Sequence, residues 1–138
     1  MTLGLLQNGG WGPAGSLVYL SSLSYYVGYP GAAVYAATKD GLTHLSRSLR
    51  AAGYRTTVVF PGPTRTDHAR RYSPDNSRED RRMPPEQVAE AIFTAEQRGQ
   101  RRLIPGAANK LLAFAGRIVP TVMENAMRRT LYEKIHHV

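Results

Sequence analysis

The sequence contains no cysteine and no long hydrophobic run. The absence of cysteine excludes disulfide bonds, thiolate metal sites and cysteine nucleophiles. No apolar run approaches the roughly 20 residues that a bilayer-spanning helix needs. The first residues also lack the charged-then-apolar pattern of a secretory signal. We therefore expect a cytoplasmic protein.

Acidic residues are scarce, because 10 Asp and Glu stand against 18 Lys and Arg and leave a net charge of +8. A basic balance can indicate a nucleic-acid or anionic-membrane partner. Many of the arginines come in pairs, spread over predicted loops and helix ends, and no nucleic-acid-binding module surrounds them. These pairs are Arg70-Arg71, Arg81-Arg82, Arg101-Arg102 and Arg128-Arg129. We interpret most of them as solvated surface and expect no nucleic-acid partner.

The most informative stretch begins with an apolar run, Leu17 to Leu20, which predicts a buried strand and ends in a serine pair. A loop broken by glycine and proline follows, and then a helix-like segment opens. Tyr35 and Lys39 lie four residues apart on this segment, so they share one face of the helix. Ser22 precedes Tyr35 by thirteen positions and is expected where parallel strands present their ligand-binding edge.

A hydroxyl, a phenol and an ammonium at one point suit proton transfer at an oxygen atom. A free tyrosine has a pKa of about 10, and a nearby lysine ammonium favours the phenolate and brings that pKa closer to neutrality. A serine hydroxyl can hydrogen-bond a carbonyl or alkoxide oxygen beside the phenol. None of these groups carries hydride, so redox chemistry here requires a cofactor.

The stretch resembles the active-site segment of the short-chain dehydrogenase/reductase family, in which a strand ends in Ser-Ser and Tyr-x-x-x-Lys follows on a helix. Ser22, Tyr35 and Lys39 match this pattern in residue type and spacing. Further on, Pro61-Gly62-Pro63-Thr64-Arg65-Thr66 is similar to the family's Pro-Gly-x-x-x-Thr loop, which lies against the nicotinamide end of the cofactor. The resemblance extends from about residue 14 to residue 106.

The resemblance implies an α/β fold, namely a partial Rossmann-like, doubly wound parallel sheet with flanking helices and a helical C-terminal tail. It implies NAD or NADP as cofactor and a small-molecule substrate whose carbonyl and alcohol forms are interconverted by hydride transfer. Tyr35 would be the general acid/base, Lys39 would favour its phenolate and hold the ribose, and Ser22 would orient the carbonyl.

The resemblance also implies which side chains contact each ligand. The implied cofactor-binding residues are Tyr35, Lys39, Pro61, Gly62, Thr64 and Thr66. The implied substrate-binding residues are Ser22, Tyr29 and Pro30. His136 and His137 have no partner ligands at metal-site spacing, so we assign no metal site.

No segment matches the family's nucleotide-binding half. Residues 1–13 are typical of a helix end that runs into a glycine-rich loop. Gly9-Gly10-Trp11-Gly12 has neither the spacing nor the preceding strand of a dinucleotide fingerprint. We therefore expect a truncated chain, the C-terminal catalytic half without its nucleotide-binding half. The absent strands would expose a sheet edge and weaken cofactor binding.

The remaining pattern predicts two units, a catalytic half over residues 1–106 and a helical tail over residues 107–138. A main helix is expected over 32–52, and its leucines at helical spacing predict the buried face. Residues 69–84 lack periodicity and predict an irregular, mobile segment. Other expected elements are a strand over 55–60, a helix opening at 84–87, a short strand over 101–105, and a break between two tail helices at Pro120.

Two other functions stay open. The chain could be a catalytically inactive remnant that binds a protein partner through the exposed sheet edge or the helix 32–52, a helix that in the family often lies in a subunit interface and so could form a homo-oligomer. It could also be an epimerase or dehydratase acting on nucleotide sugars, although the short span after Pro61 leaves little room for a sugar domain. The basic amphipathic tail could lie on a membrane surface, or cover the sheet or a partner subunit, which we favour.

Overall fold

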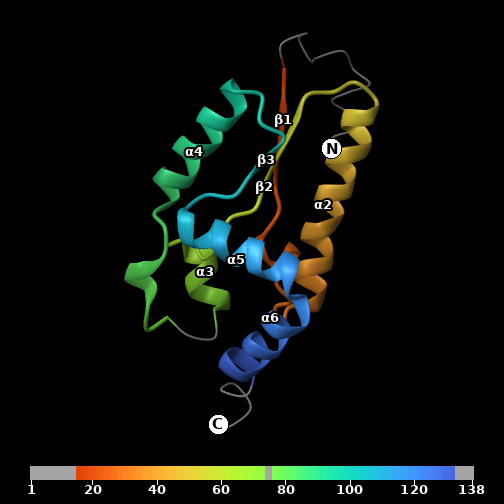
Figure 1. Ribbon diagram of the computed structural model, residues 1–138. Helices are drawn as coiled ribbons and strands as arrows, with labels where there is room; N and C mark the ends of the chain where they lie inside the picture. The colour runs from red at the N-terminus through yellow and green to blue at the C-terminus, as the bar shows by residue number, and fades with distance from the viewer. Residues whose placement is uncertain (1–14, 74–75, 133–138) are drawn as a thin grey trace.

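A computed structural model describes residues 15–73 and 76–132 and contains one sheet of three parallel strands (Figure 1). The strands are β1 (Leu17–Leu20), β2 (Thr56–Val59) and β3 (Arg102–Leu103), in the order β1-β2-β3. β2 is central and pairs in parallel with both neighbours. All three lie within the segments predicted as strands, which confirms the partial parallel α/β sheet.

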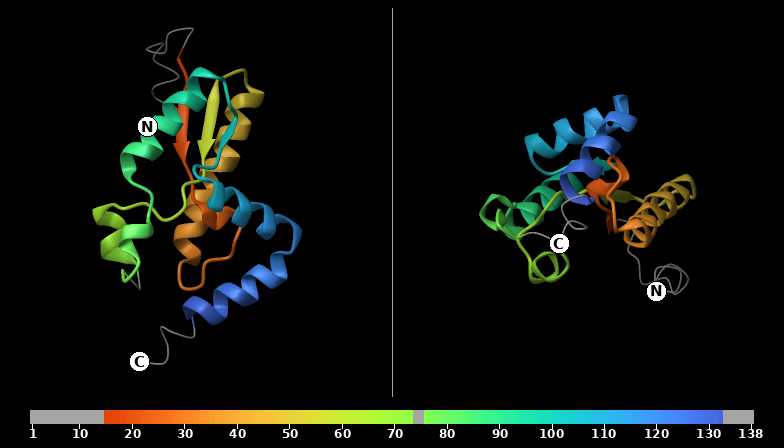
Figure 2. Two further views of the ribbon diagram at one scale, coloured as in Figure 1. Left: turned by 60° about the vertical axis from the view of Figure 1, so that its left-hand side comes forward. Right: turned by 90° about the horizontal axis from the view of Figure 1, so that it is seen from below.

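Helices cover both faces of this sheet. They are η1 (Leu23–Tyr25), α2 (Ala33–Ala51), α3 (Asp67–Tyr72), η2 (Glu79–Arg81), α4 (Pro85–Gln97), α5 (Ala107–Ile118), α6 (Pro120–Met127) and η3 (Arg128–Tyr132). Figure 2 shows α2 on one side of the strands and α4 on the other. Because the strands are parallel and the helices that connect them lie on both faces, the arrangement is doubly wound, as predicted.

The core centres on β2, whose residues are all buried because it has a strand on each side and a helix on each face. Val59 and the following Phe60 are completely inaccessible. The buried face of α2 consists of Thr43, Ser46 and Leu49, so the predicted row of leucines is confirmed at Leu49 and wrong at Leu45, which is 36% exposed. Small hydroxyl residues take these positions because they hydrogen-bond into the strands, as described below.

The irregular segment predicted for residues 69–84 contains a short helix, α3, at its start. The Thr66 side chain accepts a hydrogen bond from the Ala69 backbone N–H over 3.2 Å, and Asp67 lies in the first turn, where the helix dipole favours an acid. This Thr-Asp cap is a local signal that the absence of a longer periodicity obscured. The predicted loop was therefore wrong at residues 69–72.

The predicted break at Pro120 is confirmed, since α5 ends at Ile118 and α6 begins at Pro120. α5 packs through Ala113 against Leu23 and Val27, in the loop that follows β1. At Gly116 the contact is so close that a β-carbon would overlap the carbonyl oxygen of Tyr26. The tail helix thus shares a core with the catalytic half. Within the described residues, no helix is long and apolar enough to cross a membrane.

Candidate active site

The carboxyl ends of β1 and β2 are fastened together at the predicted site. The Ser21 backbone N–H donates to the Val59 carbonyl over 2.8 Å, and the Leu23 N–H donates to the Pro61 carbonyl over 2.9 Å. Ser22 lies between these two bonds and caps η1, because its Oγ accepts from the Ser24 N–H over 3.2 Å. The serine pair and the Pro61 loop are therefore neighbours at one edge of the sheet.

α2 brings its lysine to the same edge. Lys39 Nζ donates to the Leu20 carbonyl over 3.1 Å, and the Lys39 carbonyl accepts from Ser21 Oγ over 3.0 Å. The same ammonium lies 5.7 Å from the ring centroid of Tyr35. Tyr35 is 42% exposed, so its phenol is open to a ligand. Within the described residues, no hydrogen bond joins Tyr35 to Ser22.

The residue that follows this lysine in the sequence is Asp40. Burial raises the pKa of Asp40, and the positive charge of His44 acts in the opposite direction. One oxygen of the Asp40 carboxyl is buried and makes no hydrogen bond within the described residues. The Asp40 carboxylate is therefore partly removed from water without the full set of hydrogen bonds that a buried carboxylate needs, which lowers the stability of its charged form.

The loop from Pro61 to Thr66 is held by its own hydroxyls. Thr64 Oγ1 donates to the Gly62 carbonyl over 3.0 Å, and Thr66 caps α3. A β-carbon at Gly62 would overlap the side-chain amide of Asn109 in α5, which itself donates to the Pro105 carbonyl over 2.7 Å. A side chain at position 62 would therefore force the Asn109 amide to move. The tail residue Asn109 was not predicted, since only the tertiary fold places it there.

The predicted substrate residues Tyr29 and Pro30 lie in the loop between η1 and α2. The Ala32 N–H donates to the Tyr29 carbonyl over 3.2 Å, and Gly31 has a positive φ of 81°, which together turn the chain into the helix. The Tyr29 side chain is exposed. Across the part of the chain that the structure describes, no hydrogen bond or ring contact joins Tyr29 or Pro30 to the serine, tyrosine or lysine of the site.

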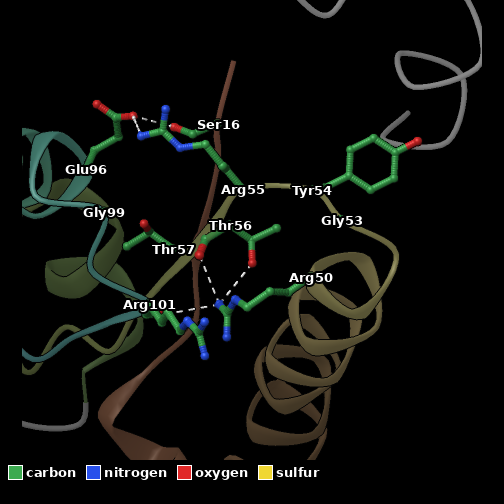
Figure 3. Close-up of a pocket in the computed structure, with 10 residues that line it drawn as sticks. All are labelled: Ser16, Arg50, Gly53, Tyr54, Arg55, Thr56, Thr57, Glu96, Gly99 and Arg101. Carbon is green, nitrogen blue, oxygen red and sulfur yellow. Dashed lines mark hydrogen bonds and ion pairs between the residues drawn. The ribbon is translucent and has the colours of Figure 1, made fainter. Parts of the chain in front are cut away.

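A cavity of about 200 Å³ lies at the opposite edge, where the strands begin (Figure 3). Its lining includes Arg50, Arg101 and Thr56, and none of the predicted site residues. Arg50 Nη2 donates to the Thr56 carbonyl and to Thr56 Oγ1 over 2.9 Å each, and to the Arg101 carbonyl over 3.3 Å. Burial lowers the pKa of Arg50, with the charges of Arg101 and Arg102 adding to the effect. Arg50 thus ties α2 to β2 and to the start of β3.

The glycine-rich segment predicted before residue 14 and the terminal pair His136-His137 lie outside the described residues. The other predicted site residues all lie within the described chain. Lys39 and Pro61 contact Leu20 and Leu23, the residues on either side of the serine pair, and Tyr35 lies beside the lysine.

The sequence and the fold were compared with known proteins. The family profile described as short chain dehydrogenase matches residues 5–77. An uncharacterized oxidoreductase of Bacillus subtilis (strain 168), YxnA, is 30% identical over 138 aligned positions, which cover 92% of this chain and 39% of YxnA. The chain therefore spans less than half the length of this curated relative.

A solved structure has the same fold. It is a short chain dehydrogenase from Burkholderia cenocepacia J2315, crystallised in complex with NADP, and it matches with a TM-score of 0.68 at 21% identity. The match covers 91% of this chain and 50% of that protein. The family match covers more than half of the chain, including every predicted catalytic and ligand-binding residue from Ser22 to Thr66. The chain belongs to the short chain dehydrogenase family.

Proposed function

We propose that this chain carries the catalytic half of an NAD(P)-dependent oxidoreductase that interconverts a carbonyl and an alcohol. The observation that carries the proposal is the position of the Lys39 ammonium, which donates to Leu20 at the end of β1 while lying 5.7 Å from the ring of Tyr35. This one group links the Tyr35 ring on the helix to the end of β1, where the serine pair begins. Such a constellation serves proton transfer at an oxygen.

In the direction of reduction, hydride adds to the carbonyl carbon and the electron pair of the π bond moves to oxygen. Ser22 donates a hydrogen bond to that oxygen and fixes its position. Tyr35 gives the oxygen its phenolic proton, and the Lys39 ammonium stabilises the phenolate that remains. In the direction of oxidation, the same phenolate accepts the proton from the alcohol.

NAD or NADP supplies or accepts the hydride when bound, and the residues at the edge fit such a group. An ammonium has three N–H donors, and within the described residues Lys39 uses one of them, on Leu20. The other two are available to the paired hydroxyls of a ribose. The Pro61 carbonyl accepts from the Leu23 N–H next to Ser22, so the Pro61-Gly62 loop lies beside the serine where the nicotinamide end of the cofactor would bind. Thr64 and Thr66 hold this loop through their hydroxyls.

The test is cofactor oxidation in the presence of a panel of aldehydes and ketones, followed by the absorbance of NADH or NADPH. Tyr35→Phe removes the proton donor, and we expect kcat to fall by about 10²–10⁴-fold. Tyr72→Phe removes an exposed phenol in α3 and is the matched control, with an unchanged rate. Full activity in Tyr35→Phe, or an equal loss in both variants, would contradict the proposed mechanism.

A second candidate is a non-catalytic module that binds a protein through its sheet edge. In the described chain β1 pairs only with β2, and its residues Val18 and Leu20 are 38% and 49% exposed. An open strand of this kind can accept a further strand. Absence of turnover with every carbonyl, together with capture of a strand-forming partner, would favour this candidate over the oxidoreductase.

A further inference from the structure

The tail helices expose a dense group of apolar side chains on the side that faces away from the rest of the protein. We call this group the outer face, and its exposed members are Leu111 (70%), Phe114 (63%), Ile118 (61%), Val119 (43%) and Val122 (63%). The opposite side of α5 carries the buried Ala113 and Gly116. A group of exposed apolar side chains of this size indicates an interaction site.

The spacing of the apolar residues of α5 and the charge of its basic residues indicate the chemical class of the partner. Leu111, Phe114 and Ile118 recur at intervals of three and four residues, so they form one stripe along the helix. Lys110 and Arg117 are exposed and lie four and three residues from Phe114, so they flank the stripe on one side. α5 contains no acidic residue. An apolar stripe with a basic flank complements acyl chains beneath anionic headgroups.

The geometry favours a helix that lies on a bilayer rather than one that crosses it. α5 has 12 residues, which is far below the length of a spanning helix. Its inner side is already occupied by the core around Leu23 and Val27, so only the outer face is free to enter lipid. Each copy of the chain carries a net charge of +8, and this charge opposes self-association through a basic surface.

We propose that the outer face docks on the surface of an anionic lipid bilayer. Leu111, Phe114 and Ile118 enter the acyl boundary, and Lys110 and Arg117 lie at the level of the lipid phosphates. Docking also holds the candidate active site at the lipid surface. A methyl group placed on Gly28 would lie 3.3 Å from Cγ of Glu124, so α6 contacts the loop that carries Tyr29.

The experiment is cosedimentation of the 138-residue chain with two kinds of vesicle, phosphatidylcholine alone and phosphatidylcholine mixed with phosphatidylglycerol. We expect the mixed vesicles to bind more tightly by about 30-fold, the contribution of two basic side chains near the surface. Added salt should remove most of this preference. Failure to sediment with the mixed vesicles would overturn the proposal.

Paired variants separate the two contributions. Phe114→Ser with Ile118→Ser should weaken binding to both kinds of vesicle by about 100-fold. Lys110→Gln with Arg117→Gln should abolish the preference for phosphatidylglycerol while leaving most of the binding to phosphatidylcholine. All four side chains are exposed, so the far-UV circular dichroism should not change.

Phe93→Ser is the matched control, because Phe93 on α4 is 64% exposed, nearly the same fraction as Phe114. We expect this variant to bind vesicles as the wild type does. An equal loss of binding in Phe93→Ser would overturn the proposal. So would a concentration-dependent dimer in sedimentation velocity that Phe114→Ser with Ile118→Ser abolishes, since the outer face would then be covered by a second copy.

Discussion

The sheet has a carboxyl edge, where the strands end, and an amino edge, where they begin. Residues from opposite ends of one helix, α2, contact these two edges, and the two edges are built differently. At the carboxyl edge, the Lys39 side chain makes a single hydrogen bond within the described residues, and Tyr35 is 42% exposed. At the amino edge, Ser46 is completely buried and Arg50 Nη2 lies within hydrogen-bond distance of four acceptor atoms, which share its two N–H groups. The first edge keeps donors available to a ligand, and the second uses its donors to close the protein.

This difference teaches that rate and stability depend on different residues of the same helix. A polar group that is already fully bonded within the protein has little left to offer a substrate, whereas its removal leaves buried partners unsatisfied. A polar group that is exposed and partly bonded can be removed at little cost in folding free energy. Changes at the carboxyl edge should therefore affect turnover, and changes at the amino edge should affect unfolding.

After Tyr35→Phe, the largest effect is expected at the carboxyl edge, for Ser22→Ala. Loss of the hydroxyl that orients the carbonyl oxygen should lower kcat by about 10²–10³-fold. Removal of the cap on η1 should cost about 1 kcal/mol of stability. Steady-state kinetics with a responsive carbonyl substrate measures the first effect. Ser24→Ala is the control, because the Ser24 hydroxyl is buried without a partner in the described chain, and a comparable rate loss there would contradict the assignment.

The next largest effect is a loss of folding stability from a substitution at the amino edge. Arg50→Met removes the charged donor that joins α2 to Thr56 and Arg101, and should lower the free energy of unfolding by about 1.5–3 kcal/mol. Urea denaturation measures this change. Arg47→Met alters an exposed arginine on the same helix and should stay within about 0.5 kcal/mol of the wild type. Equal stability of the two variants would remove the contrast between the edges.

Ser46→Ala should lower the free energy of unfolding by a smaller amount, about 1 kcal/mol. Ser46 Oγ donates to Thr56 Oγ1 over 2.8 Å and accepts from Arg50, and both hydrogen bonds would be lost. The same denaturation assay applies, with the exposed Ser48→Ala as control. Since Ser46 and Arg50 share the acceptor Thr56, the double variant should lose less than the sum of the single losses. Strict additivity would mean that the two residues act independently.

The smallest effect is a gain in stability, expected for Asp40→Asn. Burial raises the pKa of Asp40 above its unfolded value of about 3.9, so the folded state holds its proton more tightly. Stability conferred by this group is therefore lost as pH rises from about 4 through the folded pKa. Asp40→Asn should raise the Tm slightly at pH 7 and make no difference below about pH 4.

Thermal melts across this pH range measure the effect, with the exposed Asp80→Asn as control. A lower Tm for Asp40→Asn at pH 7 would show that the carboxylate is stabilised rather than strained.

The strands, α2 and the break at Pro120 were predictable because their signals are local. The serine pair, Tyr35 and Lys39 follow one another at short spacing, and a strand and a helix place them automatically at the same edge. Proline likewise interrupts a helix at its own position. The same few residues form the family motif and determine the local backbone. The predicted positions of the strand, the loop and the helix at the carboxyl edge therefore agree with the observed fold.

The tertiary contacts at the two edges were not predictable in this way. Thr43 and Ser46, rather than Leu45, lie on the buried face of α2. Their hydroxyls donate hydrogen bonds to Ser21 and Thr56, which are in other segments of the chain. Hydrophobic periodicity ranks leucine above serine and contains no information about such partners. Asn109 reaches Gly62 for the same reason, through a contact that only the tertiary fold creates.

The most direct test of the account is calorimetric titration of the chain with NADH and NADPH, comparing the wild type with Lys39→Met and Arg47→Met. We predict measurable binding of at least one cofactor that Lys39→Met weakens by about tenfold and Arg47→Met leaves unchanged. That result would place the cofactor at the carboxyl edge. Equal affinity of all three proteins, or no binding of either cofactor, would contradict a working cofactor site in this chain and favour the protein-binding module.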